Sequence, residues 1–381
     1  MNPPAMSPRA QRAGNLRAPI TISERDPMKK NHSLLALLGG VLLLPPALAA
    51  APTTTAPGAS DKDILTAELR HKSYPKWDFV LPKETWTTVS DRIPLPGSDS
   101  SAYQVAKRGP LKIEVDSTGN GRFDSKVKGM GGSLTLRGRD EEGESFQYAV
   151  RFKSSSSAWR WSAGGAMRGK LGGHTILIID QNNNGLYNDY GQDAMIVGKG
   201  EAASFLSRVI NLKGELYDFE ISPNGTQVTA TPYEGETGML NMTEEYTVNG
   251  NLVAAVVRSG DYSFNVADYR EGLAVPAATY SLESGYATRG KTETVRIRNG
   301  KMGPIEVKAG AEKSVGWGSP VRIEFDYEKD GEYVTVQPDV VFYGAANEEY
   351  HTFTPNAKSP KIIIRDKRTG KEVISGRFGG C

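Results

Sequence analysis

The chain of 381 residues is poor in the residues that build disulfide frameworks and local zinc sites. Its single cysteine is Cys381, which excludes an internal disulfide and leaves a free thiol or an intermolecular bridge. It has four histidines, and none has another His or Cys three to five residues away, so a sequence-local zinc motif is excluded. No G-x-S-x-G segment or other catalytic motif withstands inspection, and we assign no catalytic residue.

The chain also lacks an excess of charge of either sign. It holds 46 Lys and Arg against 44 Asp and Glu, and removing residues 1–49 leaves 40 basic and 42 acidic side chains. A nearly neutral body argues against nucleic acid as a partner. Hydrophobic residues make up 38% and there are 42 glycines, which is ordinary for a folded protein and excludes wholesale disorder.

Long hydrophobic runs are missing too. The apolar stretch Leu35 to Leu44 spans about ten residues, whereas a spanning helix needs roughly 20. It follows the basic Met28-Lys29-Lys30 and precedes Ala47-Leu48-Ala49, the pattern of a bacterial signal peptide. We therefore expect residues 1–49 to be an N-terminal extension and signal peptide, residues 50–61 a linker, and the mature chain to be exported to the periplasm or the exterior without a transmembrane span.

Strand patterns separated by turn residues recur every 8–12 positions after residue 70 and predict an all-β protein of two or three β-sandwich domains. The turn Pro223-Asn224-Gly225 predicts a hairpin between strands at Leu216 to Ile221 and Thr226 to Thr231. Asp61 to Leu69 is expected to form one short helix. The predicted domains are 62–234, which carries two acidic loops, then 235–300 and 301–381.

The segment Val275-Pro276-Ala277-Ala278-Thr279-Tyr280-Ser281-Leu282 resembles the "VPAGTY" strand of carboxypeptidase-regulatory-like, transthyretin-type sandwiches, with Ala278 in place of the usual glycine. The resemblance implies a small sandwich over 235–300 whose strand aromatic packs in the core. The following segment, with Gly316-Trp317-Gly318 and alternating strands, predicts an Ig-like sandwich over 301–381.

Asp180 to Asp189 follows a strand predicted at Thr175 to Ile179 and has the spacing D-x-N-x-N-G. It resembles the first half of the EF-hand and dockerin calcium loop, in which alternate oxygens converge on one ion and a glycine makes the sharp turn. Tyr187, at the eighth position, is expected to point into the core. The family's bidentate acid at the twelfth position is replaced by Gly191. The implied ligands are Asp180, Asn182, Asn184, the Leu186 carbonyl and Asn188, with Asp189 and Asp193 close enough to supply the missing carboxylate.

A second loop repeats the spacing 64 residues earlier, after a strand predicted at Leu111 to Val115. Its twelfth position is Val127, again without an acid. The implied ligands are Asp116, Thr118, Asn120 and Asp124. Few carboxylates predict weak structural calcium binding, on the order of 10⁻⁴–10⁻³ M. The alternative is a pair of polar turns that hold no metal.

Trp159 and Trp161 alternate with Arg160 and are expected to face the same side of a strand. They either pack in the core or form a solvent-facing platform on which sugars stack. The sequence as a whole favours an exported, non-enzymatic binding or structural protein whose partner is a protein or polysaccharide at the cell envelope. The alternatives are a carbohydrate-binding surface protein that uses the two tryptophans and, less favoured, a secreted hydrolase whose site is assembled from distant residues.

Overall fold

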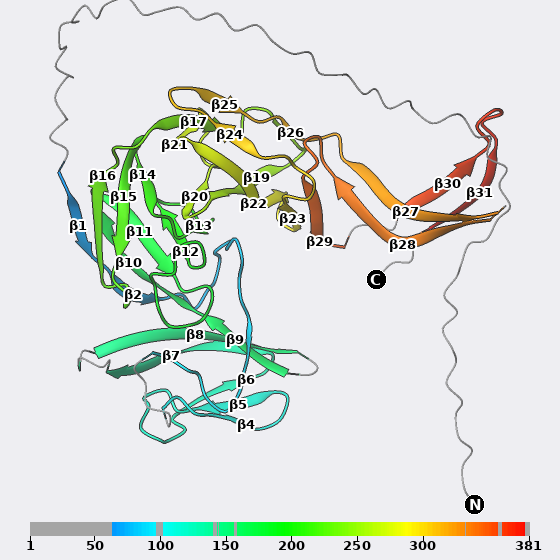
Figure 1. Ribbon diagram of the computed structural model, residues 1–381. Helices are drawn as coiled ribbons and strands as arrows, with labels where there is room; N and C mark the ends of the chain where they lie inside the picture. Colours follow the sequence, from blue (N-terminus) through cyan, green and yellow to red (C-terminus); the bar gives the residue numbers. More distant parts are fainter. Residues whose placement is uncertain are drawn as a thin grey trace, which may run out of the picture.

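The computed structural model describes residues 63–96, 102–139, 143, 145–155, 158–331, 333–356 and 360–377. The predicted signal peptide, the linker and Cys381 lie outside these ranges. The described chain is all-β, as predicted, with thirty-one strands in eight sheets (Figure 1). Across the same ranges, no helix is long and apolar enough to cross a membrane.

The helix expected at Asp61 to Leu69 is wrong, because Leu65–Glu68 forms strand β1 and pairs antiparallel with β16. Leu65 and Ala67 point toward the core while Thr66 and Glu68 face solvent, which is the period-2 pattern of a strand. Long-range pairing has overridden local helix preference here.

The first region, up to about residue 234, contains a sandwich of two antiparallel sheets. One sheet runs in the order β1, β16 (Gln227–Pro232), β15 (Glu215–Ile221) and β14 (Val209–Leu212). The other runs in the order β13 (Ser204–Phe205), β12 (Ala194–Val197), β11 (His174–Ile179), β10 (Gly165–Leu171) and β2 (Arg70–Ser73). The predicted hairpin at Pro223-Asn224-Gly225 is confirmed, since β15 and β16 pair on either side of it and Gly225 has a φ of 74°.

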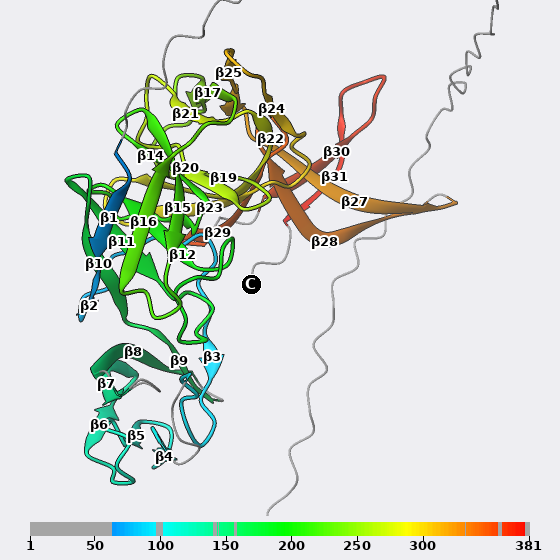
Figure 2. The same cartoon turned by 60° about the vertical axis from the view of Figure 1, so that its left-hand side comes forward.

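Two further sheets of this region form a lobe on one side of the sandwich (Figure 2). One runs β3 (Thr87–Thr88), β9 (Ala158–Ala163), β8 (Ser145–Ser155) and β7 (Gly131–Arg139). The other runs β4 (Val105–Lys107), β5 (Lys112–Val115) and β6 (Ser125–Lys128). A single hydrophobic core joins lobe and sandwich, because Leu136 and Trp161 belong to the same buried cluster as Ile178 and Phe219.

The second region is built around one long sheet and two small ones. The long sheet runs β20 (Tyr262–Asn265), β19 (Asn251–Ser259), β22 (Ala278–Arg289), β23 (Glu293–Arg298), β29 (Glu349–Thr354), β28 (Tyr333–Tyr343) and β27 (Arg322–Asp330), with β24 (Ile305–Val307) paired to β22. The small sheets are β21 (Leu273–Pro276), β17 (Thr237–Asn241) and β25 (Glu312–Ser314), and β18 (Tyr246–Thr247) with β26 (Trp317–Gly318).

The predicted domain boundary at residue 300 is wrong. Strand β23 pairs with β29, and β17 pairs in parallel with β25, so strands from both sides of residue 300 share the same sheets. Trp317 and Tyr350 lie in the same core cluster as Tyr280. The range 301–354 therefore completes the sandwich that begins near residue 237. Tyr280 is buried as expected for the strand aromatic, and its hydroxyl donates to the Pro276 carbonyl at 2.9 Å.

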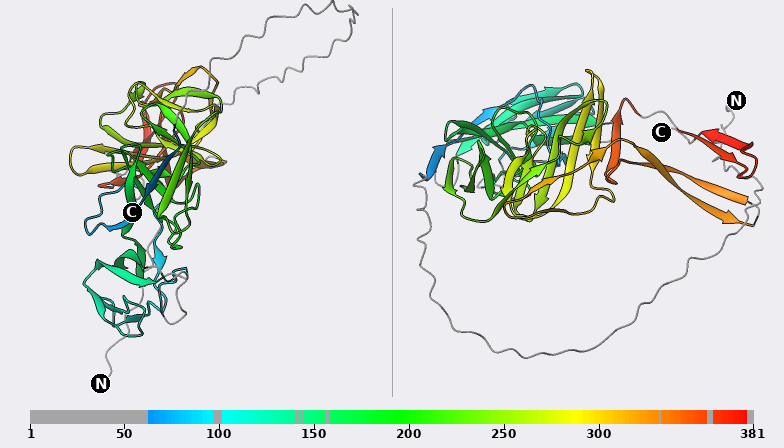
Figure 3. Two further views of the ribbon diagram at one scale, coloured as in Figure 1. Left: turned by 90° about the vertical axis from the view of Figure 1, so that its left-hand side faces the viewer. Right: turned by 90° about the horizontal axis from the view of Figure 1, so that it is seen from above.

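Two hairpins extend from this second sandwich at the C-terminal end of the described chain (Figures 1 and 3). The long hairpin consists of β27 and β28, and β28 is tied to the body through Phe342 and Tyr343, which pair with β29. The second hairpin, β30 (Lys361–Arg365) and β31 (Glu372–Arg377), is a two-stranded sheet of its own.

Candidate metal centre

The loop between β11 and β12 curls around the carboxylate of Asp180, which is fully buried at the end of β11. Its Oδ1 accepts from the backbone N–H groups of Asn183 at 2.6 Å and Asn184 at 3.2 Å, and its Oδ2 accepts from Gly185 N–H at 2.6 Å. The curl needs positive φ at Asn183 (67°) and Gly185 (82°), conformations that Asn and Gly adopt most readily. This local geometry is what the D-x-N-x-N-G spacing predicts.

Three side chains of the loop converge on one point. Both Asn182 Nδ2, at 2.8 Å, and Asn184 Nδ2 donate to Oδ2 of Asp189. The backbone N–H of Asp189 in turn donates to Oδ2 of Asp193 at 3.1 Å. The third and fifth loop positions are therefore brought together at the Asp189 carboxylate, and Asp193 is joined to the Asp189 backbone.

Asp193 has the least satisfied carboxyl group of the three aspartates. It is fully buried, and its Oδ1 has no hydrogen-bond partner. Burial, followed by the nearby Asp180 carboxylate, raises the pKa of Asp193 to about 9, and burial raises the pKa of Asp180 to about 6. No ion pair in the described part of the chain reaches Asp180, Asp189 or Asp193. Buried carboxylates are usually paired with a cation or bound to a metal, so this arrangement lacks a positive charge.

The donor set suits a hard cation that accepts amide as well as carboxylate oxygen. Within the described ranges, no three His, Cys, Asp or Glu side chains form a metal-holding group by themselves, so amides would have to complete the shell. A half-turn of the Asn182 and Asn184 amides would exchange nitrogen for oxygen where both now face Asp189. At Asn188, the backbone carbonyl accepts from the Tyr190 N–H at 3.1 Å.

Two residues that are far from this loop in sequence, and that the spacing did not identify, form hydrogen bonds to it. The Tyr148 hydroxyl, from β8, donates to Asp180 Oδ2 at 2.8 Å. Arg258, from β19 of the second sandwich, donates through Nη1 to the Gly191 carbonyl at 3.0 Å. These contacts span 32 and 67 residues of sequence, and no local motif signals them. Tyr187 is buried in the first core, as expected.

The loop between β5 and β6 makes the same curl around Asp116. The Asn120 N–H donates to Asp116 Oδ1 at 3.1 Å, and the Gly121 N–H donates to Asp116 Oδ2 at 2.9 Å. Asp124 accepts from the Ser117 hydroxyl at 2.7 Å and from the Thr118 hydroxyl at 2.8 Å. Both carboxylates are thus satisfied by neighbouring donors.

Of the two alternatives for Trp159 and Trp161, packing in the core is confirmed and the solvent-facing platform is wrong. Their exposed fractions are 3% and 1%, and both belong to the first hydrophobic core. The two rings do share one side of β9, but that side faces inward. No ring surface is left on which a sugar could stack.

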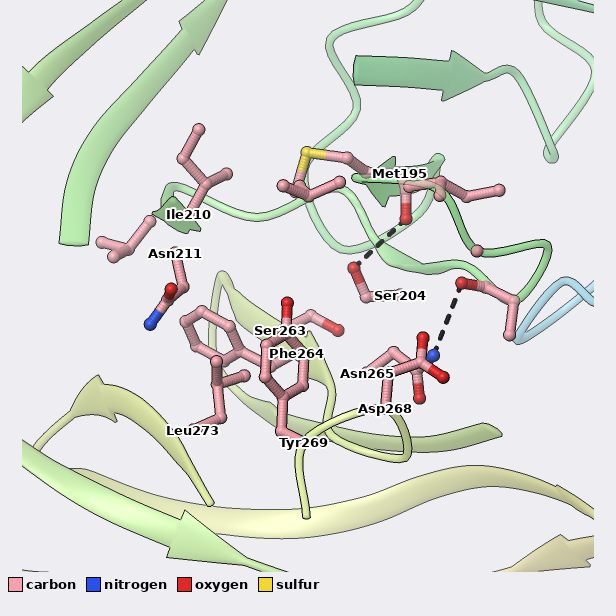
Figure 4. A pocket seen from close by; sticks show the side chains of 15 residues that line it. Met195, Ser204, Ile210, Asn211, Ser263, Phe264, Asn265, Asp268, Tyr269 and Leu273 are labelled. Carbon is pink, nitrogen blue, oxygen red and sulfur yellow. Dashed lines mark hydrogen bonds between the residues drawn. The ribbon is translucent and has the colours of Figure 1, made fainter. Parts of the chain in front are cut away.

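Two cavities of the described chain lie beside strands of the second region. Figure 4 shows a cavity of about 50 Å³ between the two regions, where Ser204 donates to the Met195 carbonyl and Asn265 donates to the Ala202 carbonyl. That volume holds only a few water molecules. An open groove of about 870 Å³ beside β17 and β18 is lined by Glu244, Glu271 and Glu312, among others, and by no histidine.

His71 and His351 each form a hydrogen bond within the fold. His71 Nε2 accepts from the Ala149 N–H at 3.1 Å, and burial lowers the pKa of His71 to about 4. His351 Nδ1 lies 2.8 Å from the Thr352 hydroxyl. Neither bond joins the imidazole to both a serine and a carboxylate, which a Ser-His-Asp site requires.

No protein-family model matches the chain, and neither a curated protein nor a solved structure matches it.

Proposed function

We propose that this protein is an exported, non-enzymatic binding or structural protein whose 180–193 loop binds one calcium ion. Its partner is a protein or polysaccharide of the cell envelope rather than nucleic acid. The ligands are the carboxylates of Asp180, Asp189 and Asp193 and the amide oxygens of Asn182 and Asn184.

The single observation that carries the proposal is the buried carboxyl group of Asp193, one oxygen of which has no hydrogen-bond partner. A fully buried carboxylate with one oxygen unpartnered lies beside a second buried carboxylate, and no described basic side chain forms an ion pair with either. Calcium offers what is missing, because it takes six to eight oxygen ligands and tolerates irregular geometry. Magnesium demands a near-ideal octahedron and gives up water reluctantly, so it suits this mixed loop less well.

The bound ion would stabilise the folded loop rather than take part in a reaction. It would hold the loop against β12 and β13, where the Gly191 N–H donates to the Leu206 carbonyl at 2.8 Å and the Leu206 N–H donates to the Asp193 carbonyl at 2.7 Å. Arg258 reaches the same loop from the second sandwich, so a rigid loop stabilises the junction between the two regions. Weak affinity, on the order of 10⁻⁴–10⁻³ M, is sufficient where calcium is millimolar.

The test is calorimetric titration of CaCl₂ into EDTA-stripped protein comprising residues 50–381, with MgCl₂ as the control ion. We expect one saturable calcium site per chain that is lost in Asp193→Asn and in Asp189→Asn. Asp124→Asn, the matched change in the self-satisfied loop, should bind calcium as the unaltered protein does. Absence of binding up to about 10 mM calcium, or loss of binding only in Asp124→Asn, would contradict the proposal.

A further inference from the structure

The C-terminal hairpins hold most of the exposed apolar surface of the described chain. Of eleven large hydrophobic side chains that are exposed, seven lie within 321–377. Clustered exposure of this kind marks an interaction surface more often than a monomer surface. The seven are Val321, Ile323, Phe325, Tyr327, Tyr333, Ile363 and Val373.

The β27–β28 hairpin is amphipathic. Along β27, charged residues from Arg322 to Glu328 alternate with apolar ones, so the two kinds of side chain face opposite sides of the ribbon. Ile323 lies opposite Phe342 and Tyr327 lies opposite Val336 in the antiparallel register, which extends the apolar side across both strands. In folded proteins such a side normally covers a core, but within the described chain β27 and β28 pair only with each other and, at the base of β28, with β29.

The β30–β31 hairpin also lacks a partner sheet within the described chain. It pairs with no other strand, and an isolated two-stranded hairpin is marginally stable in water. Ile364 lies opposite Ile374 on one side, and Ile363 is exposed on the other. Both hairpins therefore gain stability from burial against a partner.

The two hairpins carry equal and opposite charge. Residues 321–343 contain two basic and six acidic side chains, a net charge of −4. Residues 361–377 contain six basic and two acidic side chains, a net charge of +4. The hairpins thus match each other in charge as well as in exposed apolar surface.

We propose that the β27–β28 hairpin of one copy packs against the β30–β31 hairpin of a second copy, and that the reciprocal contact closes a two-fold symmetric dimer. Each copy supplies one acidic and one basic hairpin, so two identical contacts form and every hairpin is covered. A two-fold interface of this kind uses the same surface on both subunits and leaves no open end for further growth.

A second copy fits the charges better than an anionic lipid surface does. The basic hairpin alone suits anionic headgroups, but the acidic hairpin of the same copy would be repelled by the same surface. In the dimer, by contrast, both hairpins meet opposite charge, which favours correct docking over other partners.

The experiment is sedimentation equilibrium of residues 50–381, with Cys381→Ser in every sample so that no disulfide joins the copies. One variant reverses the acidic hairpin with Asp326→Lys, Glu328→Lys and Asp330→Lys, three exposed positions. The other reverses the basic hairpin with Lys367→Glu, Arg368→Glu and Lys371→Glu, also exposed. All six changes lie outside both core clusters, and thermal unfolding verifies that each variant is folded.

We expect the unaltered protein to dimerise and each variant alone to associate at least about tenfold more weakly, because its hairpins now repel. An equimolar mixture of the two variants should dimerise again, since each hairpin of one then meets opposite charge on the other. High salt should weaken the dimer through screening. A monomer at all concentrations, or a dimer that both variants retain, would overturn the proposal. The calcium site lies elsewhere in the chain, so the same variants should still bind calcium. Calcium titration of these variants therefore distinguishes a failure of the dimer proposal from a failure of the proposed function.

Discussion

Replacing Asp193 with asparagine should stabilise the calcium-free protein and abolish its response to calcium. The pKa of this carboxyl is raised from 3.8 to about 9, chiefly by burial. A raised folded-state pKa gives stability that is fully present below the unfolded value and is lost as pH rises toward the folded value. Each pH unit in that window therefore costs the folded state about 1.4 kcal/mol.

The clearest window is pH 6.5 to 8.5, because in the folded state the pKa of Asp180 is about 6 and that of His71 about 4, so both groups titrate mainly below it. Over these two units the free energy of unfolding of the unaltered protein in EDTA should fall by about 3 kcal/mol on account of Asp193. The substituted asparagine side chain would be neutral throughout, and its amide can still accept from the Asp189 N–H that now bonds Asp193 Oδ2. The variant should therefore lack this decline.

The assay is urea unfolding at both pH values, with EDTA and with about 5 mM calcium. For a dissociation constant on the order of 10⁻⁴–10⁻³ M, calcium should add about 1–2 kcal/mol to the unaltered protein at pH 8.5 and nothing to the variant. Asp91→Asn, the same change at an exposed carboxylate, is the control and should behave as the unaltered protein. A variant that is less stable than the unaltered protein in EDTA at pH 8.5, or that keeps its full pH slope, would refute the reasoning.

Three further results are expected. Burial lowers the pKa of His71 to about 4, so the free energy of unfolding should fall as pH drops from 6.5 toward 4. His71→Gln keeps an acceptor for the Ala149 N–H and should lessen that fall in urea unfolding curves measured in this pH range. An unchanged pH dependence in the variant would contradict the argument. Trp161→Ala should cost about 3–5 kcal/mol in urea unfolding because it empties a core position, whereas Leu111→Ala, at an exposed side chain, should stay within about 0.5 kcal/mol; equal effects would contradict the burial argument. Gly185→Ala should cost about 1–3 kcal/mol and weaken calcium binding, because position 185 has a φ of 82° and an added Cβ meets Pro96; unaltered calcium binding would show that the curl is not needed.

The all-β class and the local form of the two acidic loops follow from the sequence. Alternating apolar and polar residues separated by turn residues specify strands, and the Asn-Gly turn at 224–225 pairs β15 with β16 as predicted. Positive φ at Gly185 and Gly121 lets the chain curl around the preceding aspartate in both loops. These features depend on neighbours a few residues apart, which is why short spacings predict them.

Tertiary structure alone decided which loop lacks a counter-charge and how the strands are shared among domains. Asp116 and Asp180 have the same local spacing, but only the Asp180 loop receives the Tyr148 hydroxyl of β8 and contains a buried carboxyl, Asp193, with an unpartnered oxygen. The pairing of β23 with β29 across residue 300 and the inward side of β9 are likewise set by strands far apart in sequence. The energy of a strand comes from its partners and its burial, and a single sequence does not state which partners a strand will find.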